Sequence, residues 1–165
     1  MDLMVTYLEM TAPPSSLPQP LPAVQVTTAR EILANDDYLA LYSAIGAALQ
    51  WDSRLRMPQD ALAELLSQSS THLHVLRQND VAIGLAEFVE VGTPDVELVH
   101  FGLVSTAHGR GLGKFFLDQA LRAIWLHAPA RLWLHTDTND SPAAIPLYTK
   151  AGFQPYLTQM ETFPD

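Results

Sequence analysis

The residues best suited to chemistry form a glycine-rich loop, "HGRGLGK", directly ahead of an apolar helical pattern. Gly109, Gly111 and Gly113 alternate with other residues, and Arg110 and Lys114 place two positive charges beside them. Because the N-terminus of a helix exposes backbone N–H groups without partners, glycines at this point let an anion such as a phosphate approach closely. The structural alternative is that the first two glycines supply positive φ angles for a tight turn, and that the third allows close packing of helix on sheet.

The composition narrows the chemistry that the rest of the chain can offer. There is no cysteine among the 165 residues, which excludes disulfides, thiolate catalysis and cysteine-ligated metals. His72 and His74 share a strand face, but no metal-binding spacing accompanies the six scattered histidines, so no metal is expected. Eighteen acidic against nine basic residues give a net charge of −9 without any basic block, which argues against nucleic-acid binding and favours a cationic or neutral substrate.

Strand-like and helical periods alternate around the loop. Strands at 72–77, 81–91 and 96–104, separated by polar turns, are expected to form an antiparallel run. A helix over about residues 111–127 then crosses to a strand at 131–136, which lies parallel to 96–104. The pattern predicts a mixed α/β fold, a mostly antiparallel sheet of six or seven strands flanked by helices, with the remaining strands at 3–10, 24–28 and 153–163 and two helices within 36–51 and 57–68.

Prolines mark two segments that interrupt regular structure. Residues 11–23 are proline-rich and are expected to form an extended connector, since they suit neither a helix nor an interior strand. Ser141 is expected to cap a late helix, with Pro142 at its first position and Gly152 at its end. Pro146 inside that helix removes one backbone hydrogen bond, which predicts a short or irregular helix.

The length favours a single domain over residues 1–165, with enough apolar residues to bury one core. The N-terminal segment lacks a basic region followed by an apolar run of signal-peptide length. No stretch of about 18 apolar residues occurs either. We therefore expect a soluble, cytoplasmic protein without membrane contact.

The loop does not fit the two phosphate-binding spacings G-x-G-x-x-G and G-x-x-x-x-G-K-[ST], because it reads G-x-G-x-G-K-F. Residues 108–113 instead resemble the acetyl-coenzyme A (acetyl-CoA) loop of the GNAT acetyltransferases, [Q/R]-x-x-G-x-[G/A] between a strand and a helix. "VELVHFGLV" is similar to that family's fourth strand, and "SPAAIPLYTKAGF" is similar to its later segment, in which a tyrosine lies four residues before Gly-Phe. The resemblance covers residues 72–163, which it implies are the acetyl-CoA-binding and catalytic core.

The resemblance implies the GNAT acyl-CoA N-acyltransferase fold, with acetyl-CoA as co-substrate and no metal. The loop would bind the pyrophosphate, and a wedge between the strands at 96–104 and 131–136 would hold the pantetheine arm against fourth-strand backbone. His108 stands where the family has Arg or Gln, and Ser141 where it often has Asn, which implies a weaker or pH-dependent contact at His108. The implied coenzyme-binding residues are Phe101, Leu103, Val104, His108, Gly109, Arg110, Gly111, Leu112, Gly113, Lys114 and Ser141.

Glu97 resembles the glutamate that serves as general base in one branch of the family. Strand alternation places it on the face of Val99, Phe101 and Leu103, and apolar neighbours raise the pKa of a carboxyl group, as a base requires. The alternatives are a surface strand residue in a salt bridge, a water relay as the base, or Glu87 on the preceding strand.

Tyr148 matches the family tyrosine that is commonly assigned as general acid to the coenzyme A thiolate, and a phenol is protonated at neutral pH. The alternative is an aromatic ring that simply packs on the sheet. Tyr42, Trp51, Asp52 and Arg54 lie near the junction of the first two helices and are expected to line the substrate pocket. Trp51 could equally anchor the helical pair to the core.

The resemblance therefore predicts an acetyltransferase that moves an acetyl group from acetyl-CoA to an amine of a small molecule or exposed peptide. The alternative is a non-catalytic module on the same fold, either an acyl-CoA sensor or a protein-interaction surface. The strands at 3–10 and 153–163 could pair within a monomer or across a homodimer.

Overall fold

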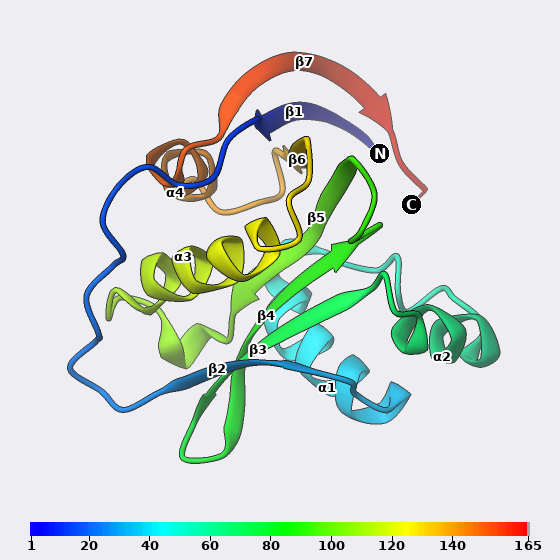
Figure 1. The fold of residues 1–165 in the computed structure, drawn as a ribbon. Coiled ribbons are helices and arrows are strands. Elements are labelled where there is room, and N and C mark those ends of the chain that lie inside the picture. Colours follow the sequence, from blue (N-terminus) through cyan, green and yellow to red (C-terminus); the bar gives the residue numbers. More distant parts are fainter. Residues whose placement is uncertain (165) are drawn as a thin grey trace.

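The computed structural model describes residues 1–164, and within them the chain forms seven strands, four α-helices and two 3₁₀ turns (Figure 1). The predicted mixed α/β fold is confirmed. The elements in chain order are β1 (Asp2–Met10), β2 (Thr27–Glu31), α1 (Asn35–Gly46), η1 (Ala47–Leu49), α2 (Gln59–Ser67), β3 (His72–Gln78), β4 (Val81–Val89), β5 (Asp95–Leu103), η2 (Ser105–Ala107), α3 (Leu112–Trp125), β6 (Arg131–Asp137), α4 (Ala144–Ala151) and β7 (Gln154–Thr162).

The seven strands form one sheet in the order β2-β3-β4-β5-β6-β1-β7. β3, β4 and β5 make the predicted antiparallel run. β6 pairs parallel to β5, because the crossover through α3 returns the chain in the same direction. The other neighbouring strands pair antiparallel.

The N-terminal strand lies inside the sheet rather than at its edge. β1 pairs antiparallel with β6 on one side and with β7 on the other, so the two terminal strands pair within one chain. The chain then passes along residues 11–26, all of them described and none in a helix or strand, to reach the opposite edge of the sheet at β2 (Figure 1). β2 begins later than the strand expected at 24–28, because Val24 and Val26 pack against the core instead of pairing.

Helices cover both faces of the sheet and divide the core in two. α3 and α4 bury Phe116, Leu121 and Tyr148 in the larger apolar cluster on one face. α1 and α2 bury Leu41 and Leu62 against β3 and β4 on the other face. Within residues 1–164 no helix is long and apolar enough to cross a membrane.

The late helix begins after the predicted position. α4 has Ala143 as its N-cap, whereas the Ser141 hydroxyl accepts a hydrogen bond from the Ala143 N–H at 3.2 Å in the preceding turn. Pro146 falls in the first turn of α4, where an N–H has no acceptor inside the helix, so it costs no internal bond. Gly152 ends the helix with φ 119°, as predicted.

Candidate active site

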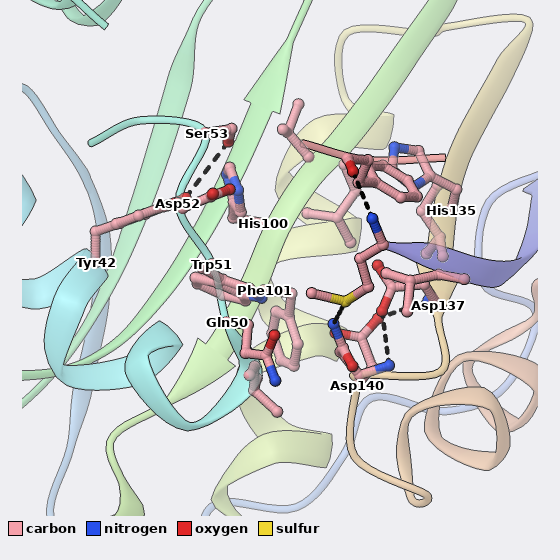
Figure 2. A pocket seen from close by; sticks show the side chains of 18 of the residues that line it. Tyr42, Gln50, Trp51, Asp52, Ser53, His100, Phe101, His135, Asp137 and Asp140 are labelled. Carbon is pink, nitrogen blue, oxygen red and sulfur yellow. Dashed lines mark hydrogen bonds between the residues drawn. The ribbon is translucent and has the colours of Figure 1, made fainter. Parts of the chain in front are cut away.

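A wedge opens between β5 and β6. In the described chain only three residue pairs join them, the last being Glu97 with Trp133, although both strands continue further. A cavity of about 410 Å³ lies beyond this point, at the position that the resemblance implied for a wedge (Figure 2). Its walls come from α1, the segment after it, β5, β6, α4 and both ends of the chain: Met1, Leu3, Tyr42, Leu49, Gln50, Trp51, Asp52, Ser53, Leu98, Val99, His100, Phe101, Leu134, His135, Asp137, Asn139, Asp140, Tyr148, Phe163 and Pro164.

The register between β4 and β5 shifts at Val99, in the wall of this cavity. Phe88 pairs with Leu98 and Glu87 pairs with His100, which leaves Val99 without an opposite residue in β4. Such a bulge inserts one residue into the strand, so the alternation of side chains reverses beyond it. Side chains two positions apart across the bulge therefore no longer share a face.

The bulge corrects the orientation predicted for Glu97. Its neighbour Val96 packs into the apolar cluster beneath α3, as do Phe101 and Leu103 beyond the bulge. Glu97 therefore lies on the opposite face, together with His100. The expectation that it shares a face with Phe101 and Leu103 was wrong, because strict alternation assumes a strand without an inserted residue.

The glycine loop leads into α3 with open space above its backbone. Gly109 and Gly111 have φ angles of 79° and 71°, and a Cβ at either would meet nothing within 4 Å. In the described chain, the backbone N–H groups from 109 to 114 have no hydrogen-bond acceptor. A Cβ on Gly113 would lie 3.6 Å from Leu103 Cδ1, an ordinary contact. Positive φ thus explains the first two glycines, whereas close packing does not explain the third.

The polar side chains near the loop have partners of their own. His108 donates from Nε2 to the carbonyl of Leu103 at 2.9 Å, and Arg110 donates to a carbonyl of η2 at 2.7 Å. Lys114 lies in a separate hollow of about 130 Å³ between α3 and α4. Among the implied coenzyme-binding residues within 1–164, only Phe101 lines the main cavity.

Tyr148 also lines the cavity, from α4. Its ring is buried against Phe101 and Phe153, with ring centroids 6.2 and 5.8 Å away. Burial raises the pKa of Tyr148, and the nearby charge of Asp140 raises it further, so the phenol stays protonated. Its hydroxyl has no hydrogen-bond partner in the described residues and is free to donate.

Glu87 forms a buried polar cluster behind the cavity wall. Its carboxylate has no exposed surface and accepts hydrogen bonds from the hydroxyl of Tyr38, from Nε of Arg54 at 3.0 Å and from Nδ1 of His100 at 3.1 Å. Burial alone would raise the pKa of Glu87, but the hydrogen bond and charge of His100 and the charge of Arg54 lower it to about 2. Glu87 is therefore a fixed negative charge at neutral pH.

Three of the four residues expected in the substrate pocket, Tyr42, Trp51 and Asp52, line the cavity. Arg54 does not, because its guanidinium turns to Glu87. The spacing of the sequence could not reveal this pair, since its members are 33 residues apart.

Glu97 lies beside the cavity rather than in its wall. Its carboxylate is 3.8 Å from Nε2 of His135, which does line the cavity. Burial raises the pKa of Glu97, and the charge of His135 offsets this only in part. Glu97 and Glu87 lie on the same face of the sheet, but the pKa of Glu97 is raised and the pKa of Glu87 is lowered.

The turn after β6 supplies acidic residues that sequence reasoning missed, although the polar run "HTDTND" was a signal for them. Asp137 and Asp140 line the cavity together with Asp52, and no Lys or Arg in the described chain does so. Asp140 is held in place by the hydroxyl of Thr136 and by the backbone N–H of Asp137 at 3.0 Å. Among residues 1–164, no three His, Cys, Asp or Glu side chains are grouped to hold a metal ion.

Residues 35–153, well over half of the chain, match the model of the acetyltransferase (GNAT) family. The chain belongs to this family. The predicted GNAT family and the predicted fold are thereby confirmed.

Individual relatives are more distant. The chain is 27% identical over 128 residues to mycothiol acetyltransferase of Jonesia denitrificans, a match that spans 75% of this chain and 38% of that protein. A putative GNAT acetyltransferase from Novosphingobium aromaticivorans superposes with a TM-score of 0.63 at 14% identity, over 97% of this chain and 63% of the other. An aminoglycoside acetyltransferase from a soil metagenome, in complex with trehalose, gives a TM-score of 0.63 at 14% identity, over 77% and 87%. The chain thus spans less than two thirds of the first two proteins, and the two structural matches show the fold alone.

Proposed function

We propose that this protein transfers an acetyl group from acetyl-CoA to an amine while both substrates are bound. The observation that carries the proposal is the separation of β5 from β6 beyond Glu97, next to a loop of free N–H groups. An extended thioester arm fits between strands whose edges are unpaired, and its anionic end fits a helix N-terminus. Membership of the GNAT family supports the same chemistry.

In this proposal the pyrophosphate of acetyl-CoA binds the N–H groups from 109 to 114, with Arg110 and Lys114 as nearby cations. The pantetheine arm follows the end of β5 and the residue after it, from Phe101 to Val104, and Ser141 in the turn before α4 is a further coenzyme contact. His108 contributes less than an arginine would, because its Nε2 already donates to Leu103. The reaction needs no metal.

The transfer requires one proton to leave the amine and one to reach the departing thiolate. Tyr148 supplies the second, since its protonated hydroxyl borders the cavity without a partner. For the first, Glu97 is the candidate that the family resemblance implied, and burial raises its pKa. A water molecule is needed to connect Glu97 with the cavity, since its side chain is not part of the wall.

The cavity favours a positively charged amine as acceptor. Three carboxylates, Asp52, Asp137 and Asp140, line it, and no Lys or Arg among the described residues does so. The N-terminal ammonium of Met1, which donates to the carbonyl of Phe163 at 2.9 Å, offsets part of this negative charge. The rings of Tyr42 and Trp51 suit a cation or an apolar group. A small molecule or an exposed peptide amine satisfies this chemistry. The aminoglycoside acetyltransferase among the structural relatives agrees with a small-molecule acceptor.

We further propose that residues 1–165 act as one domain, in which 72–163 bind the coenzyme and carry out the transfer, as a monomer or homodimer. The competing function is a non-catalytic acyl-CoA sensor or protein-interaction module. It is favoured by the engagement of His108 with a backbone carbonyl, where the family has a longer side chain.

Thermal melting with acetyl-CoA, followed by acetylation assays on a broad panel of amines, tests the proposal. Acetyl-CoA at about 100 times its Kd should stabilise the protein by about 2.7 kcal/mol. S-acetylpantetheine is the matched control, and it should stabilise less because it lacks the pyrophosphate. A melting curve unmoved by acetyl-CoA contradicts the acetyl transfer and the acyl-CoA sensor and supports the protein-interaction module, whereas binding without acetylation of any amine supports the sensor.

A further inference from the structure

The Glu87 cluster fixes the proton positions on His100. Nδ1 of His100 lies 3.1 Å from Oε1 of Glu87. An ionised carboxylate only accepts hydrogen bonds, so Nδ1 must carry the proton and donate it. In the neutral ring, Nε2 then has an unprotonated lone pair.

Glu87 cannot serve as the base itself. Its pKa is lowered to about 2, and both of its oxygens are occupied, Oε1 by Tyr38 and His100 and Oε2 by Arg54. It therefore keeps its charge and its position when a proton arrives nearby. This is the arrangement in which a carboxylate orients a histidine and stabilises the imidazolium that forms.

Nε2 of His100 is the free end of this cluster. It has no hydrogen-bond partner in the described chain. The fully buried side-chain atoms without a partner are Thr71 Oγ1, His74 Nε2 and Trp125 Nε1, so Nε2 of His100 retains some solvent-accessible surface. The ring is held between those of Trp51 and Tyr42, with centroids 4.8 and 4.9 Å away. Figure 2 shows His100 on the cavity wall with Trp51, across from His135.

We propose that His100 is the catalytic base that takes the proton from the acceptor amine, and that Glu87 is its positioning residue. This rests on the proposed acetyl transfer. The ammonium N–H bond breaks and a bond from that proton to Nε2 forms, after which the amine nitrogen attacks the thioester carbon and the C–S bond breaks. Tyr148 gives its proton to the thiolate and regains one from the amine nitrogen. The products are the amide, the free thiol and one proton on His100, which leaves through the cavity.

The charges around His100 suit this role. Glu87 faces it from β4, Arg54 from the segment after α1, Tyr38 and Tyr42 from α1, and Glu97 lies further along β5. Arg54 is paired with Glu87, so its charge is balanced within the cluster. The N-terminal ammonium of Met1 lines the same cavity and donates to the carbonyl of Phe163.

His100→Asn tests the assignment, because the asparagine amide can keep the donor to Glu87 but has no group to take a proton. We expect kcat to fall by about 100-fold or more, the KM for acetyl-CoA to stay within about twofold, and the acid limb of the pH–rate profile to disappear. Added imidazole should restore part of the rate. The matched control is His127→Asn, an exposed histidine next to the end of α3, which should keep the rate and the pH profile of the unaltered protein.

Glu97→Gln separates the two candidate bases. If His100 is the base, this variant keeps the acid limb, and a lost limb in Glu97→Gln with an intact one in His100→Asn overturns the proposal. Glu87→Gln should lower kcat more than it changes the KM for acetyl-CoA, because the ring loses the carboxylate that holds its Nδ1–H and its orientation. If that variant does not fold, His100→Asn carries the test.

Two results distinguish this proposal from the one on which it rests. A protein that acetylates an amine at the same rate and with the same pH profile after His100→Asn overturns the role of His100 alone, whereas a protein that does not bind acetyl-CoA overturns the acetyl transfer. Nitrogen-15 NMR of the histidine rings needs no acceptor. It should show the Nδ1–H tautomer for His100, and an Nε2–H tautomer overturns the proposal.

Discussion

The glycine loop and the Glu87 cluster adjoin the same half of β5, but polar groups in the loop lack hydrogen-bond partners whereas those in the cluster have them. In the described part of the loop, six consecutive N–H groups, from 109 to 114, have no acceptor, and the space above Gly109 and Gly111 is open. In the cluster, Glu87 is fully buried and accepts hydrogen bonds from three side chains. Free polar groups beside open space indicate where a ligand binds, whereas a saturated buried carboxylate indicates where side chains are held.

The two regions should therefore respond differently to substitution. Changes in the cluster remove interactions that exist in the folded protein, so they should lower stability first. Changes in the loop affect groups that are still unpaired, so they should lower coenzyme affinity first. Four measurements test this difference.

Glu87→Ala should have the largest effect, because it leaves the guanidinium of Arg54 partly buried without its counter-charge. Breaking a buried pair in this way costs about 3–5 kcal/mol of unfolding free energy. Urea unfolding measures it. Glu97→Ala is the control, since its carboxylate has one partner at 3.8 Å, and it should change stability by less than about 1 kcal/mol. Equal losses from the two substitutions would contradict the comparison.

The stability of the protein should fall in acid through Glu87. Its folded-state pKa of about 2 lies below the ordinary value of 4.5, so its contribution is complete above pH 4.5 and is lost as the pH falls toward 2. The contribution is about 3 kcal/mol. The contribution of Glu97 to stability depends on pH in the opposite sense. Its raised pKa stabilises the folded state at low pH, and this stabilisation is lost as the pH rises through the folded-state pKa.

Urea unfolding of the unaltered protein and of Glu87→Gln at a series of pH values measures this dependence. The difference in unfolding free energy between the two proteins should become smaller below pH 4.5, the ordinary pKa of the carboxyl group. For Glu97→Gln, the stability of the unaltered protein relative to the variant should instead increase as the pH falls. A Glu87 gap that is constant with pH contradicts the assignment of a fixed charge.

Tyr148→Phe removes a hydroxyl that has no partner among the described residues, so stability should change little. Turnover should fall about 10- to 100-fold, because the thiolate loses its proton donor. Binding of acetyl-CoA should stay within about twofold. Calorimetry and steady-state kinetics measure the two quantities, and a loss of affinity as large as the loss of turnover would refute the role of this hydroxyl.

Gly111→Ala and Gly113→Ala compare two glycines of the same loop. Gly111 has φ 71°, which disfavours alanine by about 1 kcal/mol, and the resulting strain should weaken acetyl-CoA binding by about fivefold. A Cβ at Gly113 makes an ordinary contact, so alanine there should leave binding unchanged and stabilise by up to about 1 kcal/mol. Thermal melting and calorimetry give both values. Equal effects at the two positions would show that backbone conformation is not what the loop requires.

Local patterns predicted the elements around the loop well, because each depends on residues close together in the chain. The turns between β3, β4 and β5, the start of α3 at the glycines and the end of α4 at Gly152 all follow from short stretches. Two predictions failed. Val99 inserts one residue into β5, which reverses the faces of its side chains beyond that point. Ser141 caps a turn ahead of α4 instead of the helix itself.

The chain's own residue order set its family, its glycine loop and the place of Tyr148, because these depend on spacing over a few positions. The acceptor side of the cavity depends instead on contacts between distant segments: α1 brings Tyr38, the segment after it brings Arg54, and β5 brings His100 to one carboxylate on β4. No local pattern encodes which of several glutamates is buried. Folding decides it, because a buried charge is stable only where enough donors converge on it.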